Sequence, residues 1–395
     1  MESLLQSAER LQDEMVKCRR HVHQHPEVGT ELPETSKYVK DKLISYGYEV
    51  NEICPYGLVV LAGGAIPGKC IMLRSDMDAL PVTELTDEPF KSENGASHSC
   101  GHDLHIAMML AVAKMLKERE KEIKGTVKIV FQPAEEVFKG CQMMIDAGVL
   151  ENPKVDVAVT QHVNGYTDFA LGQVLVPAGG VGLASCDVFQ IEVTGKSGHG
   201  AWPFQSIDPI NAAAHVYLAL QEIQAREIAA EDCVVLTEGI FQAGIAPNVI
   251  PEKAVIEGTL RTIDESIRAK CLERIRQIAS STAQAFRAQA DVTVSGGCPS
   301  FMNDPELCTD AERYLKNLLG AENVYRKKPG AIFSSEDFSS VSRKVPTIQI
   351  SLTVGNKSTN LYPMHNPKVV LKEDPMYIGA ASMAEIAIRW LEEHS

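Results

Sequence analysis

The sequence has no long hydrophobic run, and this absence is the first guide to its class. No apolar stretch approaches the roughly 18 residues of a membrane span, and the N-terminal residues MESLLQSAERLQDEM lack the basic start and apolar run of a signal peptide. Basic residues are few as well: 38 Lys and Arg stand against 52 Asp and Glu, and the net charge of -14 would repel a nucleic acid. We therefore expect a cytoplasmic protein that binds neither membrane nor nucleic acid.

The sequence also lacks paired cysteines. Its ten cysteines are scattered, with no CxxC pair among them, which indicates reduced thiols of which one or two are available for a metal or catalytic site. The HExxH motif of zinc proteases and the HxE and PCxxC motifs of zinc deaminases are missing too. These two zinc chemistries are therefore excluded.

What the sequence does contain is an alternation of apolar strands and amphipathic helices. Apolar segments at 70–73, 126–131, 155–160 and 347–352 predict buried strands, and residues 2–19, 104–117 and 374–393 have the periodicity of helices. The intervening residues have a β-α-β-β-α order of their own, which is typical of a separate small domain. We expect an α/β fold in which a discontinuous domain, residues 1–183 and 297–395, carries an inserted α+β domain, residues 184–296.

Polar residues follow three of the predicted strands directly. Asp76, the pair Glu135-Glu136 and His162 each stand at or just beyond a strand end, which is where sites form in open α/β sheets. The segment Cys100-Gly101-His102-Asp103-Leu104-His105 adds a thiol, two imidazoles and a carboxylate; alone it fits a metal site and a buried polar turn about equally well. Singly, the two glutamates would be surface acids, and His162 and His365 would be structural. Jointly these groups form the mixed donor set that borderline divalent metals favour.

Nine motifs in one order make the sequence resemble a known family. This is the metal-dependent aminoacylase and carboxypeptidase family, in the amidohydrolase branch of hippurate hydrolases, plant indole-acetyl-amino-acid hydrolases and N-acetyl-diaminopimelate deacetylases. The motifs are Arg19 to Glu27, Leu73 to Pro81, Cys100 to Asp103, Gln132 to Glu136, Gly198 to Ala201, Asn248 to Pro251, Gly258 to Arg261, Ser335 to Phe338 and Pro363 to Pro367. The resemblance implies a zinc-exopeptidase-like catalytic domain with an inserted lid and dimerisation domain.

The resemblance also implies two divalent metal ions per chain, zinc, manganese or cobalt. Their implied ligands are Cys100, His102, Glu136, His162 and His365. The thiolate would lie between the ions, with His102 and His162 toward one ion, and Glu136 and His365 toward the other. Arg74 stands where more distant branches carry a ligating His. Asp76 would orient an imidazole from outside the ligand set, although a strand-end cap is an equally good interpretation.

Further roles follow from the same resemblance. Glu135 corresponds to the general base, and His199 to the donor that stabilises the oxyanion in the partner subunit's site of a homodimer. Asn248 and Arg261 correspond to residues that hold the free α-carboxylate of the substrate. Without the resemblance, His199 would be interpreted as a turn residue and Arg261 as a solvated strand residue.

The predicted function is metal-dependent hydrolysis of an N-acyl amino acid or of a short peptide with a free carboxylate. Two alternatives stay open: a dipeptidase or carboxypeptidase of the same family, and a non-catalytic metal-binding homologue. The presence of both Glu135 and His199 argues against the second. The sequence departs from the branch at Phe204, where a His is usual, and at Ser334, where a Gly is common; Phe204 affects the expected substrate preference rather than the chemistry.

Overall fold

A computed structural model of the protein describes residues 2–358 and 360–395, which divide into two compact units. The first unit comprises Met1–Gly182, Met302–Gly330 and Asp337–Ser395, and the second comprises Leu183–Phe301 and Ala331–Glu336. The second unit thus contains a short return segment, residues 331–336, which the sequence pattern did not indicate. Each unit is built around a hydrophobic core of its own.

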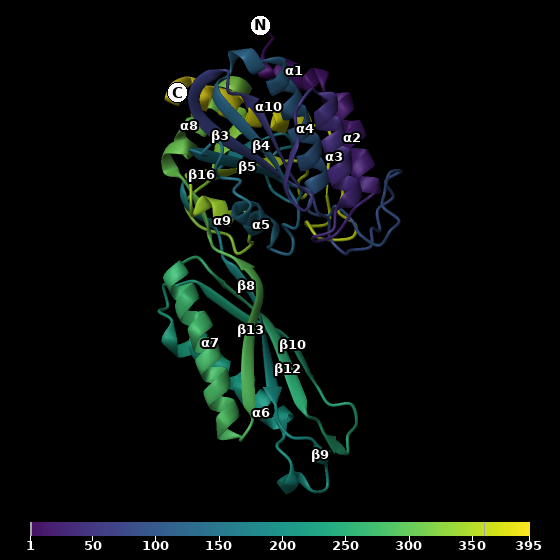
Figure 1. The fold of residues 1–395 in the computed structure, drawn as a ribbon, viewed down its shortest axis with the longest axis vertical. Coiled ribbons are helices and arrows are strands. Elements are labelled where there is room, and N and C mark those ends of the chain that lie inside the picture. The colour runs from purple at the N-terminus through teal and green to yellow at the C-terminus, as the bar shows by residue number, and fades with distance from the viewer. Residues whose placement is uncertain (1, 359) are drawn as a thin grey trace. The chain divides into compact units, whose positions relative to one another are not determined.

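A mixed eight-stranded sheet forms the frame of the first unit (Figure 1), in the order β1-β2-β4-β3-β5-β16-β6-β15. Its strands are β1 (Asn51–Cys54), β2 (Gly57–Gly63), β3 (Ile66–Asp76), β4 (Lys124–Gln132), β5 (Val157–Asn164), β6 (Val174–Val176), β15 (Val324–Arg326) and β16 (Thr347–Thr353). The central strands β4, β3, β5 and β16 run parallel to one another. Their carboxyl ends therefore meet at one edge of the sheet.

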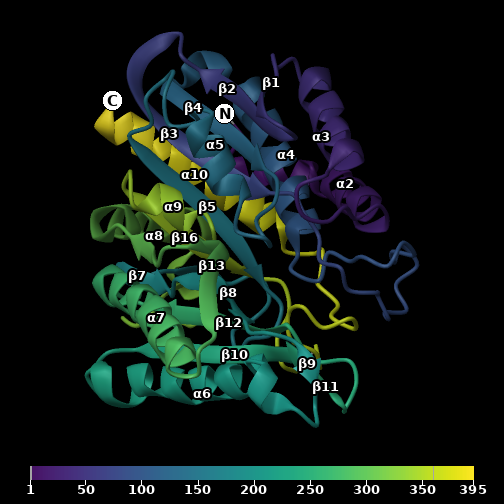
Figure 2. The same cartoon turned by 60° about the horizontal axis from the view of Figure 1, so that its bottom comes forward.

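Helices cover both faces of this sheet (Figure 2). Helices α4 and α10 pack directly on the face that carries the main hydrophobic core, and α5 and α9 lie against the other face. The helices of this unit are α1 (Leu4–Arg10), α2 (Gln12–Gln24), α3 (Pro33–Ser45), α4 (His102–Glu118), α5 (Gly140–Asp146), α8 (Pro305–Leu319), α9 (Ser339–Ser342) and α10 (Met376–His394), with short turns η1 (Glu120–Glu122) and η4 (Ala321–Asn323). The short strands β7 (Gly180–Leu183) and β14 (Phe301–Asn303) lie where the chain passes between the units.

The single helix that the sequence predicts over residues 2–19 is divided in two. Helix α1 ends before Leu11, whose main-chain N–H bonds to the oxygen of Ala8 at 3.0 Å, a tightened turn, and α2 starts at Gln12. Both helices keep their apolar side chains on the same core. The periodicity was therefore correct although the continuity was wrong.

Helix α4 begins at the predicted metal motif because of Gly101. Its φ of +86° is a conformation that favours glycine, and a Cβ there would lie 2.4 Å from Val163 Cγ2. From His102 onward the helix is buried on nearly all sides, as expected of a helix with an almost continuous apolar sequence. The glycine lets the buried helix start directly beside strand β5.

The second unit is an antiparallel sheet in the order β10-β12-β8-β13, with helices α6 and α7 packed on one face (Figure 2). Its elements are β8 (Cys186–Thr194), β9 (Gly198–His199), α6 (Pro209–Glu222), β10 (Val234–Ala243), β11 (Val249–Ile250), β12 (Lys253–Thr262), α7 (Glu265–Ala285) and β13 (Gln289–Cys298), with short turns η2 (Pro203–Gln205) and η3 (Ile223–Glu227). Asp208 and Asp264 cap the two helices by accepting main-chain N–H groups. Strand β13 was not predicted from the sequence, because its side chains are mostly small or polar.

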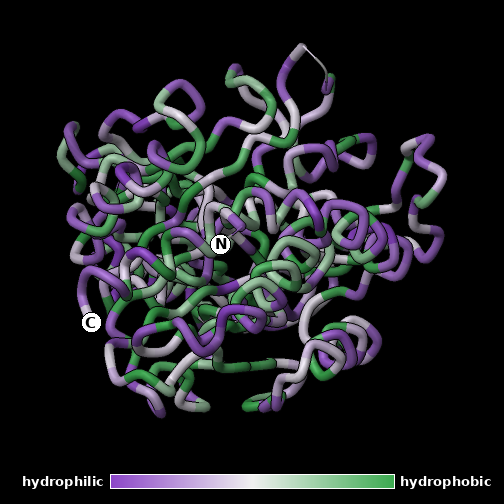
Figure 3. The backbone as a smooth tube through the Cα atoms, turned by 90° about the horizontal axis from the view of Figure 1, so that it is seen from above, coloured by the Kyte–Doolittle hydropathy of each residue, from purple (hydrophilic) through white to green (hydrophobic). Residues whose placement is uncertain are grey.

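Hydropathy follows this architecture (Figure 3). Hydrophobic segments run mostly through the interior, and hydrophilic segments mostly through the outer loops. Within the described residues, no helix combines the length and the apolarity required to cross a bilayer.

Candidate metal centre and active site

The five predicted metal ligands come from four separate segments of the first unit and converge at the carboxyl edge of its sheet. His162 lies on β5, Glu136 follows β4, Cys100 and His102 stand at the start of α4, and His365 lies in the segment after β16. Cys100 Sγ is 3.5 Å from His162 Nε2 and 3.2 Å from His365 Nε2. The thiol is therefore placed between two imidazoles from distant parts of the chain.

These donor atoms form two groups that share the thiol. One atom each from Cys100, His102 and His162 lie within 4.8 Å of one another, and the same holds for Cys100, Glu136 and His365. The grouping has the same members as the apportioning that the family resemblance implies. The ligand role of each residue stays a prediction, which metal analysis can test.

The chemistry of this cluster fits divalent cations. Among the described residues, the buried atoms His102 Nε2 and Glu136 Oε1 have no hydrogen-bond partner, which is costly for polar atoms removed from water. The two atoms are 3.9 Å apart, and each belongs to one of the two groups around Cys100. A cation would satisfy both, and thiolate, imidazole and carboxylate are together a suitable set for zinc and similar ions.

Burial governs the protonation of the cluster. It raises the pKa of the Cys100 thiol well above its usual value, with the charge of Glu136 acting in the same direction. Burial, together with the charge of Asp78, also raises the pKa of Glu136 to about 7. It lowers the pKa of His162 to about 3. The site thus disfavours charge on three of its own donors, so a bound cation is what would stabilise the ionised thiol and carboxylate.

Asp78 positions the two glutamates, a role that was not predicted from the sequence. Its carboxylate accepts the main-chain N–H of Glu135 at 2.9 Å and that of Glu136 at 3.0 Å, and its main-chain oxygen bonds to His102 Nδ1 at 2.8 Å. Ala134, just before the pair, has a φ of +57°, a conformation that L-residues rarely adopt. The strained turn at Ala134 and the buried carboxylate of Asp78 together hold the N–H groups of Glu135 and Glu136 toward the same carboxylate.

Asp76 contacts an imidazole, but the strongest contact is with His105. Asp76 Oδ1 is 2.6 Å from His105 Nδ1, whereas Asp76 Oδ2 is 3.6 Å from His102 Nε2. His105 Nε2 in turn accepts the main-chain N–H of Val163, next to His162. The contacts of Asp76 thus lead through His105 to strand β5, which carries the predicted ligand His162; an orienting role for Asp76 stays a prediction. The signal for His105 was its place three residues after His102, on the same face of a helix.

Arg74 lies on strand β3, two residues before Asp76. Its guanidinium is buried and donates to Asp76 at 2.7 Å, to Gln132 at 3.0 Å and to Asp337 at 3.2 Å. Asp337 also accepts the main-chain N–H of Cys141, at the start of α5. A guanidinium has no lone pair for a metal, so this network ties strands β3 and β4 to α5 behind the site.

The N-terminal motif also has a structural role. Asp103 is buried and accepts from Arg19 Nε at 2.7 Å and contacts His23 Nδ1 at 2.8 Å. His23 Nε2 lies 3.1 Å from Glu84. The network joins helix α2 to the start of α4, one residue beyond His102, and so fixes the helix that carries the predicted ligand.

The second unit brings His199 and Asn248 together. His199 lies on β9 opposite Val249 of β11, and the neighbouring Gly200 donates its N–H to the main-chain oxygen of Asn248 at 2.9 Å. The His199 side chain is exposed, and its Nδ1 accepts the N–H of Ala201 at 3.0 Å. This leaves Nε2 as the ring nitrogen that carries the proton and can donate it.

Arg261 stands near the end of β12, whose start at Lys253 closely follows β11, the partner of β9. It therefore lies at the other end of this strand from His199 and Asn248. At about 3.3 Å per residue, the strand places roughly 26 Å between Lys253 and Arg261. The guanidinium donates to the oxygen of Phe333 at 3.0 Å and to Ser335 Oγ at 2.9 Å. Arg261 therefore orders the return segment.

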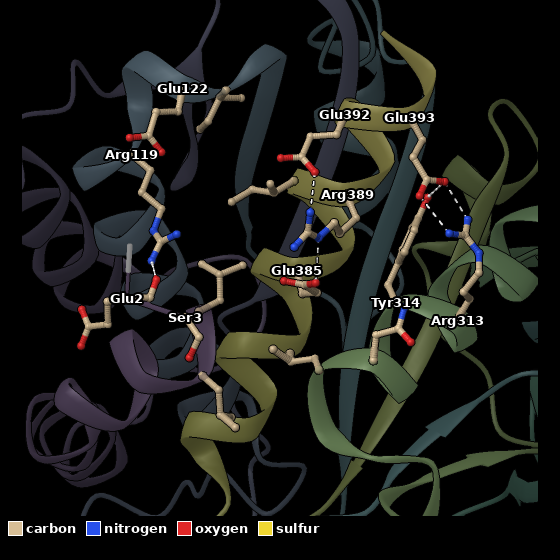
Figure 4. Close-up of a pocket in the computed structure, with 16 residues that line it drawn as sticks. Glu2, Ser3, Arg119, Glu122, Arg313, Tyr314, Glu385, Arg389, Glu392 and Glu393 are labelled. Carbon is tan, nitrogen blue, oxygen red and sulfur yellow. Dashed lines mark hydrogen bonds and ion pairs between the residues drawn. The ribbon is translucent and has the colours of Figure 1, made fainter.

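A large cavity of about 690 Å³ lies elsewhere in the first unit, between α1, α8 and α10 (Figure 4). Its arginines are engaged by acids: Arg313 pairs with Glu393 at 2.7 Å, and Arg389 with Glu385 at 3.0 Å. None of the predicted site residues is among the residues that line it. The size of a cavity is weaker evidence for an active site than a cluster of possible metal ligands. We therefore assign the candidate active site to the carboxyl edge of the eight-stranded sheet.

Comparisons with known proteins agree with the fold and with a site for divalent metals. The sequence profile of Peptidase family M20/M25/M40 matches residues 72–389. The chain is 33% identical to thermostable carboxypeptidase 1 of Saccharolobus solfataricus, over 99% of this chain and 98% of that protein, and 37% identical to IAA-amino acid hydrolase ILR1-like 4 of Arabidopsis thaliana, over 96% and 86%. A dinuclear metal-binding M20 peptidase from Bacillus subtilis has a similar structure, with a TM-score of 0.79 and 30% identity, over 97% of this chain and 99% of that one.

The chain belongs to peptidase family M20/M25/M40. It is a hydrolytic enzyme that acts on amide bonds, with an α/β fold and a site suited to divalent metals. The family resemblance inferred from the nine motifs is therefore confirmed.

Proposed function

We propose that this enzyme removes the acyl group from N-acyl amino acids and uses two divalent ions, zinc, manganese or cobalt, for the reaction. One observation carries this proposal: a thiol, three imidazoles and a carboxylate from four segments converge around shared donor positions, with Glu135 beside them. Support for the substrate class comes from the Arabidopsis relative, named as a hydrolase of IAA-amino acids.

Glu135 is the proposed proton carrier. When bound, divalent ions supply Lewis acidity, which polarises the amide carbonyl and makes a water molecule more acidic. Glu135 has an oxygen within 4.8 Å of donor atoms of His102 and Glu136, and its main chain is held by Asp78. Its carboxylate would take a proton from the water and return it to the leaving amine nitrogen. Glu136 would stay a ligand, so the two adjacent acids have different tasks.

Two chains are proposed to share each site in a homodimer. His199 would donate to the oxyanion, while Asn248 and Arg261 would bind the α-carboxylate. Within one unit, roughly 26 Å of strand separates Arg261 from the end that carries His199 and Asn248, which is longer than an N-acyl amino acid. One substrate can therefore contact all three residues only if they come from two chains.

The surface of the second unit supports association between two copies. Helix α6 exposes Leu218 (63%), and the edge strand β10 exposes Ile240 (40%) and Phe241 (45%). Exposed apolar side chains on an unpaired edge strand are unusual for a surface that stays in water. They support a lid and dimerisation role for this unit.

Carboxypeptidase activity is the second candidate, favoured by the Saccharolobus relative named as a carboxypeptidase. A panel of N-acetyl, N-benzoyl and N-indoleacetyl amino acids beside dipeptides with a free amine, each assayed with Zn²⁺, Mn²⁺ or Co²⁺, separates the two. We expect turnover of the N-acyl amino acids. Hydrolysis of only those substrates with a free amine would contradict the proposal. If the enzyme hydrolysed neither class of substrate, the result would favour the alternative of a non-catalytic metal-binding homologue.

A further inference from the structure

Burial lowers the pKa of both Lys128 and Lys327 in the first unit, and the two lysines differ in how their ammonium groups are satisfied. Lys128 on β4 donates all three of its bonds, to the main-chain oxygens of Val149, Glu151 and Pro153 at 2.8, 2.7 and 2.9 Å. Lys327, just after β15, forms a single side-chain hydrogen bond with the residues that the structure describes, to Ser351 Oγ at 3.3 Å. Since an ammonium carries three donors, Lys128 is complete and Lys327 is not.

Lys327 also has no acid to balance its charge. Across residues 2–358 and 360–395, no carboxylate forms an ion pair with Lys327, although the chain has 52 Asp and Glu. Burial lowers its pKa, and no neighbouring charge opposes that effect. A lysine withdrawn from water is normally paired. This one is only partly exposed and is the kind of group that an anionic ligand would complete.

Ser351 places this ammonium beside the candidate metal centre. On β16, Ile350 and Leu352 point into the hydrophobic core, so Ser351, between them, points to the opposite face. Ser351 pairs directly with His162 in the parallel register of β16 and β5. Paired residues of adjacent strands share a face and are about 5 Å apart. Lys327 thus reaches the strand position next to a predicted ligand.

The position of Lys327 is set by its own main chain. Its N–H donates to the oxygen of Val176 on β6 at 2.8 Å, which extends the pairing of β15 with β6. The following residue, Lys328, is exposed. The chain therefore holds one lysine toward the sheet and leaves its neighbour in water.

We propose that Lys327, with the hydroxyl of Ser351, forms a subsite for a second carboxylate of the substrate, in addition to the α-carboxylate assigned to Arg261. The inference rests on the proposed function. It names the substrate class more closely: N-acyl amino acids that carry two carboxylates, with the second one either on the acyl group or on the amino-acid side chain. The ammonium supplies a charge-assisted hydrogen bond and the serine a neutral donor.

Two matched substrate pairs distinguish these sources. N-succinyl-alanine against N-succinamoyl-alanine tests a charge on the acyl group, and N-acetyl-glutamate against N-acetyl-glutamine tests a charge on the side chain. The metal-loaded enzyme should prefer the anionic member of one pair. Lys327→Met, which keeps the length but removes the charge, should lose roughly tenfold in kcat/KM on that member, mainly through KM, and change the neutral member little.

Three controls make the outcome specific. Lys328→Met removes a charge one residue away and should leave both pairs unchanged. Lys327→Arg keeps a cation and should retain part of the preference. In metal-loaded Glu135→Gln, whose turnover is slow, calorimetry of the preferred anionic substrate should show the same tenfold weakening of binding when Lys327→Met is added.

The remaining results would overturn the inference. The first is a wild-type enzyme with no preference in either pair. The second is an equal loss of kcat/KM on the charged and neutral members in Lys327→Met. The third is a loss of kcat/KM in Lys327→Met on N-acetyl-alanine but not on N-acetyl-alaninamide. The last result would assign Lys327 to the α-carboxylate. Failure of the proposed function looks different, because the wild-type enzyme would then hydrolyse no N-acyl amino acid at all.

Discussion

The sheet edge of the first unit and the strands of the second unit present their predicted functional residues in opposite ways. Cys100, His102 and His162 are withdrawn from water and within a few ångströms of one another. His199 is exposed, and Arg261 is engaged with its own return segment at the far end of a strand. In the proposed site, the first group comes from a single chain, whereas the second is completed by another chain.

The difference teaches where a single sequence can specify a site. Parallel strands place their carboxyl ends along one edge whatever their order in the chain, so ligands on those ends meet as a result of the fold. An exposed histidine on a two-residue strand becomes part of a site only when another surface meets it. The experiments below test this contrast, beginning with the chemistry inside the first unit.

The largest effect is expected for Glu135. Replacing Glu135 by Gln removes the proton acceptor and leaves the two groups of donors around Cys100 unchanged. We expect kcat to fall by about 10² to 10⁴, with about two divalent ions retained per chain. Glu136→Gln, the matched change one residue away, should lose bound metal as well as activity. Steady-state kinetics and elemental analysis of the reconstituted proteins measure both quantities.

Equal metal content in the two glutamine variants would remove the distinction between base and ligand. Their thermal unfolding, measured in the presence of chelator, checks that both chains still fold. A wild-type enzyme with one ion or none after reconstitution would remove the dinuclear assignment itself.

The next largest effect is expected for His199. His199→Ala should lower kcat about 10²- to 10³-fold, because one oxyanion donor is lost. If His199 acts across a dimer, mixing inactive His199→Ala chains with inactive Glu135→Ala chains restores one complete site in each hybrid. Random exchange makes half of the dimers hybrid, so activity should return to roughly a quarter of wild type.

Differently tagged chains show whether hybrids have formed. Hybrids without activity would place His199 in the site of its own chain. The predicted functional residues of the two units would then differ only in how exposed they are to water. A chain that stays monomeric at assay concentrations would contradict the shared site from the start.

Asp78 tests how the first unit prepares its site. In Asp78→Asn one amide oxygen can still accept an N–H, but the amide nitrogen would face the N–H of the other glutamate, donor against donor. We expect metal affinity to fall by about 10- to 100-fold, as for other residues that hold ligands in place. Asp156→Asn is the matched control, because among the described residues Asp156 accepts a single main-chain N–H, from Cys70. Metal titrations of both variants measure the effect, and equal affinities would make Asp78 purely structural.

The central strands and the ligand segments could be predicted because their signals are local. Apolar runs predicted β3, β4 and β16 within a few residues, and the polar residues that follow them indicated the sheet edge. The pattern could not show that Asp78 joins Glu135 and Glu136, because that bond depends on the left-handed turn at Ala134, which no hydropathy pattern encodes. His105 was visible as an imidazole, but its link through Val163 to strand β5 was not.

Other features depended on long-range packing. Strand β13 has alternating polar side chains and a register shift between Val294 and Gly296, so its place in the sheet comes from pairing with β8. The return segment at 331–336 is fixed by Arg261, more than 70 residues earlier. The ammonium of Lys327 gains its setting from Ser351 on a neighbouring strand. Each of these needs a partner that the local sequence does not name.

The smallest effect is expected for Arg261, where a binding role and a structural role have to be separated. Arg261→Ala removes the cation assigned to the α-carboxylate, so KM for N-acetyl-methionine should rise roughly tenfold or more, while KM for N-acetyl-methioninamide should hardly change. Ser335→Ala removes a contact of the guanidinium but keeps its charge, and it should affect both substrates little. Equal losses on acid and amide in Arg261→Ala would mean that the residue only orders the return segment. Since that segment and Arg261 both belong to the second unit, this outcome would leave the α-carboxylate without an assigned cation there.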